Sequence, residues 1–463
     1  MTYVVSRFDD LRASLSGTVV TPEDPGYDEA RRVWNADIDR RPAVVVYCAT
    51  TEDVATAVSF ARDSSLEMSV RSGAHSMAGM CVGDAGIVID LSRMNDVAVD
   101  AGARRATAGG GALLRDLDAA TQIHGLAVPS GEVGHTGVAG ITLGGGMGWL
   151  TRQHGLTIDN LVSACVVLAD ARILRVAADE NPDLFWAIRG GGGNFGIVTE
   201  FEFALHEVGP QIDMALLFYG MDQAADAFRM AREVIPDLPP DVSFEVIALH
   251  APPEPFVPEE HHFRLGIALV AVGFGGEESH RAVVDHVRDG LPPLFEMVAP
   301  MPYTALQQMF DEGFGWGVHA YEKSLYLESF TDEAIDVIVE RVADMVSPMS
   351  AVLFYVLGGA FSAADDESTA FSGGRSPRLA MFIVGMAPDA GAQSVERAWV
   401  RGFFDAIASQ AMGTGMYVNG MGSDDAHRVP SAYGTKYARL QRIKAAYDPE
   451  NVFHRNSNIL PAP

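Results

Sequence analysis

The segment at residues 125–150, GLAVPSGEVGHTGVAGITLGGGMGWL, constrains the fold more than any other part of this chain. It holds nine glycines among its 26 residues, and Val, Ile, Leu and Trp are interleaved with them. A flexible linker is built from Gly and Ser without such apolar residues. The segment therefore predicts an ordered, close-packed loop system in which the backbone approaches another backbone or a ligand.

Regular periodicities flank this segment on both sides. Residues 41–79 predict a strand, a helix and a second strand that runs into the turn RSGAHSMAG, and residues 86–125 predict a further strand and helix. From about residue 208, long strands alternate with amphipathic helices, which indicates an antiparallel sheet backed by helices. We predict an α+β fold with a first domain at 1–207, a second domain at 208–414 and a C-terminal segment, 415–463, that returns to the first.

Charge and cysteine content exclude several classes of function. The net charge is −28 and no Lys/Arg cluster occurs, which argues against nucleic acids and anionic membranes as partners. Cys48, Cys81 and Cys165 are odd in number and lack metal-ligand spacing, so neither a disulfide framework nor a cysteine zinc site is expected. The N-terminus lacks a signal-peptide pattern and no run reaches about 18 apolar residues. We expect a soluble, cytoplasmic protein.

Two glycine motifs resemble nucleotide-binding loops but fail on context. Residues 191–196, GGGNFG, satisfy G-x-G-x-x-G, yet a predicted helix precedes them and a strand follows, the reverse of a Rossmann turn. Residues 143–148, LGGGMG, lack the Lys of a P-loop, although their free N–H groups suit an anion or a flat ring. His261 and His262 adjoin in a predicted strand and would point to opposite faces, so no metal site is expected.

The single histidine of RSGAHS, His75, indicates a function only in combination with the other motifs. Alone, a histidine in a loop of small residues is more often hydrogen-bonded than catalytic. The stretches RSGAHSMAG, GHTGVAGITLGGGMGWLTRQHGLTIDNL, NPDLFWAIRGGGGNFGIVTEFEF and YDPENVFHRNSNILP occur in this order. Together they resemble the berberine-bridge-type FAD-linked oxidases of the vanillyl-alcohol-oxidase superfamily, and within it bacterial enzymes of antibiotic pathways such as the enterocin favorskiase.

The resemblance implies a two-domain, PCMH-type FAD-binding fold whose FAD is bonded covalently through its 8α carbon to His75. Many relatives carry a second bond, from a cysteine to flavin C6, but Val133 and Gly134 stand where their Cys-Pro pair occurs. We therefore predict a single, histidyl attachment. The positions that match the family's cofactor contacts are Arg71, Ser72, Gly73, Ala74, His75, Ser76, Gly79, Gly131, His135, Thr136, Gly137, Gly140, Ile141, Gly144, Gly145, Gly148, Gly196, Ile197, Val198, Tyr417, Asn419, Asn456 and Asn458.

The resemblance also implies the chemistry, in which a substrate carbon passes a hydride to flavin N5 and O₂ reoxidises the flavin, giving H₂O₂. Thr136 matches a residue that positions oxygen, although an ordinary loop threonine is an equal alternative. Tyr417 and Asn419 match residues near the flavin ring, and Tyr417 is the preferred candidate for proton transfer.

The acid–base residues of the favorskiase subgroup correspond to Ile247 and Leu353, which cannot transfer protons. Strand alternation offers Glu245 and Tyr355 on the same faces as substitutes. We favour the plainer interpretation of these two as a solvated rim residue and a core aromatic.

The aliphatic replacements predict a hydrophobic substrate of polyketide, terpenoid or aromatic-alcohol type, and hence an oxidase of secondary metabolism. Two alternatives remain open: a flavin dehydrogenase with poor oxygen reactivity, and a flavin-bearing protein that sequesters a drug. No metal is expected, and the chain is predicted to be a monomer or a homodimer.

Overall fold

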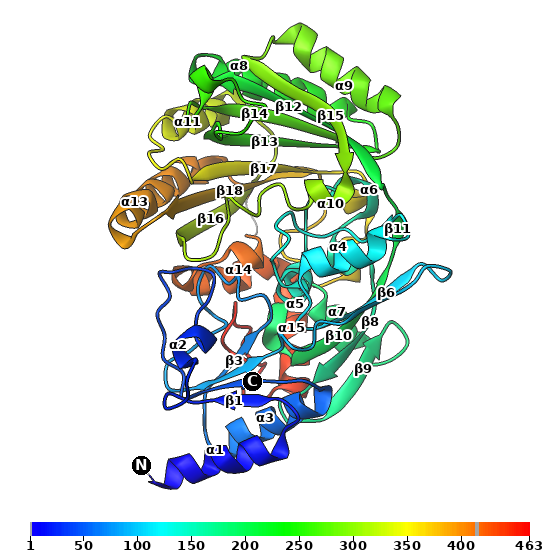
Figure 1. The fold of residues 1–463 in the computed structure, drawn as a ribbon. Helices are drawn as coiled ribbons and strands as arrows, with labels where there is room; N and C mark the ends of the chain where they lie inside the picture. Colours follow the sequence, from blue (N-terminus) through cyan, green and yellow to red (C-terminus); the bar gives the residue numbers. More distant parts are fainter. Residues whose placement is uncertain (1, 413–415) are drawn as a thin grey trace.

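The structure is a computed structural model that describes residues 2–412 and 416–463. A seven-stranded antiparallel sheet forms the upper half of the molecule as drawn in Figure 1. The strand order is β15-β12-β14-β13-β17-β18-β16, and every neighbouring pair is antiparallel. The strands are β12 (Gln211–Gly220), β13 (Val242–His250), β14 (Leu265–Gly273), β15 (Phe295–Pro302), β16 (His319–Leu327), β17 (Ala351–Leu357) and β18 (Arg378–Ala387). The predicted boundary at 414/415 lies outside the described residues.

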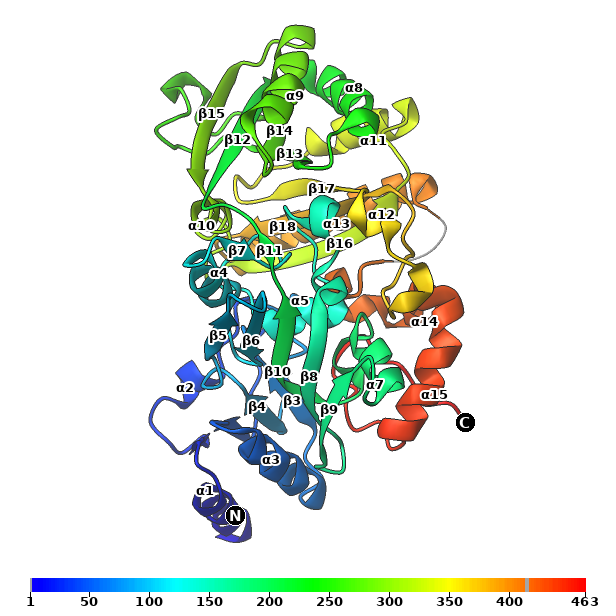
Figure 2. The same cartoon turned by 90° about the vertical axis from the view of Figure 1, so that its right-hand side faces the viewer.

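The outer face of this sheet is covered by four helices, as the sequence periodicity predicts (Figures 1 and 2). They are α8 (Ala224–Val234), α9 (Glu277–Gly290), α11 (Asp332–Val342) and α13 (Ala390–Ile407). Their apolar sides bury the outward residues of the strands, and Phe228 of α8 packs edge to face on Phe354 of β17. The inner face carries Ile247, Leu353 and Phe382, which pack toward the lower half of the molecule.

The lower half contains two further sheets. The first has the order β1 (Thr18–Val20), β2 (Val44–Tyr47), β4 (Ile87–Asp90), β3 (Met68–Arg71), with β2 and β3 parallel to β4, and α3 (Thr51–Asp63) packs beside it. The second has the order β5 (Val97–Asp100), β6 (Arg105–Gly109), β10 (Ile197–Ala204), β8 (Leu161–Val167), β9 (Ile173–Ala177). A two-stranded ribbon joins β7 (Leu126–Ala127) to β11 (His206–Glu207). The whole is an α+β fold, as predicted from the sequence.

The glycine-rich segment lies between these layers and is as tightly packed as its composition predicts. It forms the helix α5 (Val138–Gly144), flanked by loops. A Cβ on Gly137 would lie 2.3 Å from the backbone nitrogen of Gly73, and a Cβ on Gly73 would lie 2.2 Å from that of Gly137. Two loops from distant parts of the chain therefore meet backbone to backbone, which only glycine permits.

The C-terminal segment packs on the lower half and contains the helices α14 (Val429–Tyr433) and α15 (Tyr437–Tyr447). Lys444 of α15 is fully buried, and its ammonium donates to the carboxylate of Asp448 at 2.6 Å and to the carbonyl oxygens of Asn194 (2.6 Å) and Phe453 (2.9 Å). These bonds fasten the segment against the GGGNFG turn.

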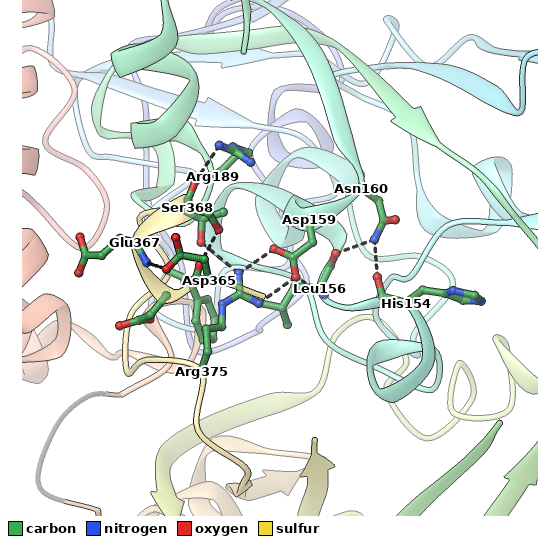
Figure 3. Close-up of polar contacts among 12 residues, drawn as sticks. His154, Leu156, Asp159, Asn160, Arg189, Asp365, Glu367, Ser368 and Arg375 are labelled. Carbon is green, nitrogen blue, oxygen red and sulfur yellow. Dashed lines mark hydrogen bonds and ion pairs between the residues drawn. The ribbon is translucent and has the colours of Figure 1, made fainter. Parts of the chain in front are cut away.

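A long connection after β17 also returns to the lower half (Figure 3). Arg375 donates two hydrogen bonds, at 2.8 and 2.7 Å, to the carboxylate of Asp159, which lies in the 3-10 helix Thr157–Asp159. Beside this pair, Arg189 donates to the carbonyl oxygen of Ser368 at 2.8 Å. These contacts fix the upper sheet relative to the loops beneath it.

Some expectations for individual segments were wrong. His261 belongs to the 3-10 helix Glu259–His261 rather than to a strand. The strands β15 and β16 were missed, because β15 contains two prolines and β16 has Glu322 and Lys323 in its middle. Proline and charge are typical of sheet edges, where both strands lie. In the parts of the chain that the structure describes, no helix is long and apolar enough to cross a membrane.

Candidate functional site

A cavity of about 440 Å³ lies between the inner face of the seven-stranded sheet and the loops of the lower half. Its wall is built from separate parts of the chain: β3 and the loop that follows it (residues 68–81), the glycine-rich segment, the GGGNFG turn, residues 417–421 and the C-terminal loop 453–457. The motifs that the sequence separates by up to about 380 residues therefore enclose one space.

Most residues proposed to contact a cofactor line this cavity. They are Ser72, Gly73, Ala74, His75, Ser76, Gly131, Thr136, Gly137, Gly140, Ile141, Gly196, Ile197, Val198, Tyr417, Asn419 and Asn456.

The other proposed residues stand one layer behind the lining. Arg71 is ion-paired with Asp90 and donates to the carbonyl oxygens of Ala30 and Arg32. Gly79 packs on Ile38, Gly144 on Asn419, Gly145 on Phe371 and Tyr417, and Gly148 on the carbonyl of Ser130. His135 contacts His75, and Asn458 lies beyond the last lining residue of the C-terminal loop.

The chemistry of this lining fits FAD. Ser72 Oγ and Asn456 Oδ1 are buried with no hydrogen-bond partner among the described residues, so both await a polar ligand. The close approach of Gly73 and Gly137 brings unshielded backbone N–H groups to the cavity wall, which suits phosphates. Leu143, Met147 and Ile141 supply an apolar surface beside these polar groups, as a flat ring system requires.

His75 is held by a chain of ring contacts. Ala74, at φ +60°, turns the loop so that His75 stacks on Trp34 with centroids 5.1 Å apart. Nε2 of His75 lies 2.6 Å from Nδ1 of His135, whose Nε2 lies 3.3 Å from the carbonyl oxygen of Asp311. Because that carbonyl only accepts, His135 donates to it from Nε2 and accepts at Nδ1, so the proton of His75 resides on Nε2. Nδ1 of His75 is then the nitrogen with a free lone pair.

Burial keeps this imidazole neutral. Desolvation, reinforced by the neighbouring His135, lowers the pKa of His75 to about 3. A neutral ring is the nucleophilic form, so His75 is suited to bond an electrophilic carbon throughout the physiological pH range.

The cysteines show no comparable activation. Cys81 lines the cavity and packs in a cluster with Ala74, but burial raises the pKa of its thiol. Burial also raises the pKa of Cys48, which lies in the core beneath β2. Since the thiolate is the reactive form, both behave as core residues. Val133 lines the cavity at the position where a second attachment was considered.

Tyr417 is presented to the cavity by two donors. Its phenol oxygen accepts from the backbone N–H of Gly146 and from Nδ2 of Asn419, both at 3.1 Å. Burial nevertheless raises the pKa of Tyr417 to about 12, so the phenol keeps its proton at neutral pH. With both acceptor positions occupied, its O–H is free to donate to a ligand.

The wall toward the upper sheet combines apolar and acidic side chains. Leu353, Phe382 and Val384 line it, and Ile247 packs in the same cluster. Tyr355 also lines it, and Glu245, which pairs with Tyr355 across β13 and β17, is only 2% exposed. The interpretation of Glu245 as a solvated rim residue was therefore wrong.

Sequence reasoning missed two further carboxyl groups at this wall, those of Glu132 and Glu322. Burial raises the pKa of Glu132 to about 7 and that of Glu322 to about 8. Glu132 stands in the glycine-rich segment and Glu322 in β16, so no local pattern connects them to each other or to Glu245.

Comparisons with known proteins agree with the site. The family described as "FAD binding domain" matches residues 42–177, and the family "Berberine and berberine like" matches residues 416–460. The FAD-linked oxidoreductase pgmH of Aspergillus terreus is 31% identical over 98% of this chain and 95% of its own.

Solved structures of oxidases share the fold. The 6-hydroxy-D-nicotine oxidase of Arthrobacter nicotinovorans superposes with a TM-score of 0.86 at 27% identity, covering 97% of this chain and 99% of its own. The glucooligosaccharide oxidase of Acremonium strictum, described with 6-S-cysteinyl, 8α-N1-histidyl FAD, has a TM-score of 0.85 at 25% identity and covers 99% of both chains.

Proposed function

The chain belongs to the berberine-like family of FAD-linked oxidoreductases, and from this premise we propose that it is an oxidase of a small hydrophobic substrate in secondary metabolism. It binds FAD and is an oxidoreductase. Bound FAD supplies a hydride acceptor, N5, and a centre that O₂ reoxidises with release of H₂O₂. The observation that carries the proposal is the apolar wall of Leu353, Phe382 and Val384, which faces the cofactor loops across one cavity.

We propose that His75 holds FAD through a single covalent bond. The neutral ring and the free lone pair on Nδ1 support it, and so does the valine at position 133. Ser72, the Gly73–Gly137 contact and Asn456 would hold the polar parts of the cofactor.

The remaining candidate residues divide into donors and acceptors. Tyr417 donates its O–H to a substrate oxygen and is itself oriented by Asn419. Glu245 and Tyr355 provide acid–base capacity at the sheet wall. We assign the positioning of oxygen to Thr136, which lines the cavity on the cofactor loop. The apolar surface of Leu353, Phe382 and Val384 favours an aromatic alcohol, terpenoid or polyketide as substrate.

The experiment is anaerobic mixing of the yellow holoprotein with a panel of aromatic, terpenoid and polyketide alcohols, followed by air. Bleaching of the flavin and stoichiometric H₂O₂ on reoxidation support an oxidase. Bleaching with slow return of colour indicates a dehydrogenase. If compounds bind and perturb the flavin spectrum but none of them bleaches the flavin, the result contradicts an enzymatic role and favours sequestration.

A further inference from the structure

Two buried carboxyl groups meet where the glycine-rich segment touches the upper sheet. Glu132 belongs to the loop between β7 and α5 and is 4% exposed; Glu245 belongs to β13 and is 2% exposed. Both carboxyl oxygens of Glu132 and Oε2 of Glu245 are buried and receive no hydrogen bond from any donor in the described residues. Buried carboxyl groups without hydrogen-bond partners require a physical explanation.

The two carboxyl groups are in mutual contact. The side chains of Glu132 and Glu245 lie close enough to act on each other, and that of Glu132 also acts on Tyr355, although the Tyr355 hydroxyl makes no hydrogen bond to it. Tyr355 faces Glu245 across the β13–β17 ladder, so the three groups come from three segments of the chain. If both carboxyls were ionised, the contact would hold two acceptors and no donor. One shared proton turns it into a short, charge-assisted hydrogen bond.

Among the residues that the structure describes, no cation acts on either carboxyl group. The titratable groups that act on this cluster are Tyr303 of α10 (Tyr303–Leu306) and Glu322 of β16, and Asp118 of α4 (Leu114–Gln122) acts in turn on Tyr303. Each of these is an acid.

Arg152 lies on α6 (Thr151–His154), a helix that packs against β13. It donates instead to the carbonyl oxygens of Leu238 and Val242. Burial without a counter-ion and a like charge in contact both favour protonation.

We propose that Glu132 and Glu245 share one proton as a single acid–base unit, and that this unit accepts the proton that the substrate hydroxyl loses on oxidation. The proposal rests on the proposed function for its substrate. In the step, the substrate O–H bond breaks and its proton goes to the singly protonated pair, which becomes doubly protonated. The carbinol carbon loses a hydride to the cofactor and is oxidised to a carbonyl carbon.

Glu132 and Glu245 have different roles because only one of them lines the cavity. Glu132 lines the cavity and is the catalytic residue, since it touches the substrate space. Glu245 stands behind it and is a positioning residue, because it acts through Glu132. Glu132 also lies three residues before His135, on the loop that contacts His75, so the proton acceptor and the cofactor tether share one rigid support.

The first test is an infrared pH titration of the carboxyl groups in the FAD-loaded protein, which needs no turnover. The wild-type pair should titrate in two separated steps. Glu132→Gln or Glu245→Gln should leave one step, at lower pH than the upper wild-type step, since the like charge is gone. Glutamine keeps the size of the side chain and can donate to the remaining carboxylate. Glu322→Gln, the control, should remove its own signal and leave both steps in place.

An upper step that keeps its position in both single variants would overturn the proposal, because the carboxyls would then titrate independently. Covalent FAD content is measured alongside and should match the wild type, which separates the expected effect from a loading defect.

The second test is the pH profile of flavin reduction by a substrate found as above. The pKa of Glu132 near 7 places the accepting form above that pH, so reduction should accelerate as the pH rises through 7. Glu132→Gln should remove this inflection and slow reduction by about 10²–10⁴-fold. A retained inflection and rate in Glu132→Gln would sink the inference and leave the oxidase proposal intact. If the two carboxyl groups titrate in coupled steps but no compound reduces the flavin, the oxidase proposal is wrong and the shared proton of the pair still stands.

Discussion

Nε2 of His75 lies 2.6 Å from Nδ1 of His135, and this one contact decides which nitrogen of His75 can bond a ligand. The carbonyl of Asp311 fixes the tautomer of His135, and His135 in turn fixes that of His75. A histidine that the sequence places among small residues thus becomes, in the fold, an oriented nucleophile that is neutral at physiological pH.

Replacement of His75 with alanine should abolish covalent flavin. Wild-type protein precipitated with acid should give a yellow, fluorescent pellet, whereas His75→Ala should release all colour to the supernatant. Mass spectrometry of the flavin peptide should show one bond, to His75. A cysteinyl–flavin peptide, or wild-type colour in the supernatant, would contradict the single tether.

Removal of the His135 acceptor should slow the attachment rather than the binding of FAD. His135→Ala leaves the Nε2–H of His75 without its partner, and loss of about 1 kcal/mol of hydrogen bonding corresponds to roughly a fivefold to tenfold lower rate. His135→Asn is the matched control, since its side-chain oxygen can accept in place of Nδ1. Acid-stable flavin is followed over time after FAD is added to apoprotein, and equal rates in the two variants would exclude this role.

The strands and helices with strong periodicity were predictable from sequence because their burial patterns are local: β13, β17 and β18 all appear where alternation or apolar runs place them. The pairing of Glu132 with Glu245 was not, because 113 residues separate them and a carboxyl in a glycine-rich loop has no periodic signal. Burial decides whether Glu245 is a rim residue or a proton carrier, and burial depends on which layer covers the strand.

Glu322 should make the apoprotein less stable at alkaline pH. Burial raises its pKa from 4.5 to about 8, so the folded protein holds this proton in a range where the unfolded chain has released it. The free energy of unfolding therefore falls as the pH rises between these two values. Glu322→Gln should gain about 1–3 kcal/mol over the wild type at pH 8.5 and little at pH 4. Urea unfolding measures this, and Glu328→Gln, at an exposed position, should change neither value.

Tyr417→Phe should impair chemistry without loss of cofactor. The phenol stays protonated to about pH 12, so it serves as a hydrogen-bond donor and contributes no inflection near neutrality. We expect flavin reduction to slow by about 10–10²-fold, in line with loss of one hydrogen bond to the reacting group, while the pH profile keeps its shape. A profile that loses its inflection near pH 7 in this variant would transfer the acid–base role from the glutamates to Tyr417.

The ion pair of Arg375 and Asp159 should be worth more than any surface pair, because Arg375 is 3% exposed and binds both carboxylate oxygens (Figure 3). Its guanidinium also stacks on Phe371, with Cζ 5.1 Å from the ring centroid, and Phe371 packs on Tyr417. Arg375→Met leaves Asp159 without this partner, which costs about 3–5 kcal/mol when a buried pair is broken. The exposed pair Arg172–Asp170 is the control, and Arg172→Met should cost less than about 1 kcal/mol.

The urea midpoint measures both costs. Flavin reduction should also slow in Arg375→Met, because the displaced Phe371 no longer supports Tyr417 at the cavity wall. Equal midpoints for Arg375→Met and Arg172→Met would show that the connection after β17 does not fasten the upper sheet to the cofactor loops.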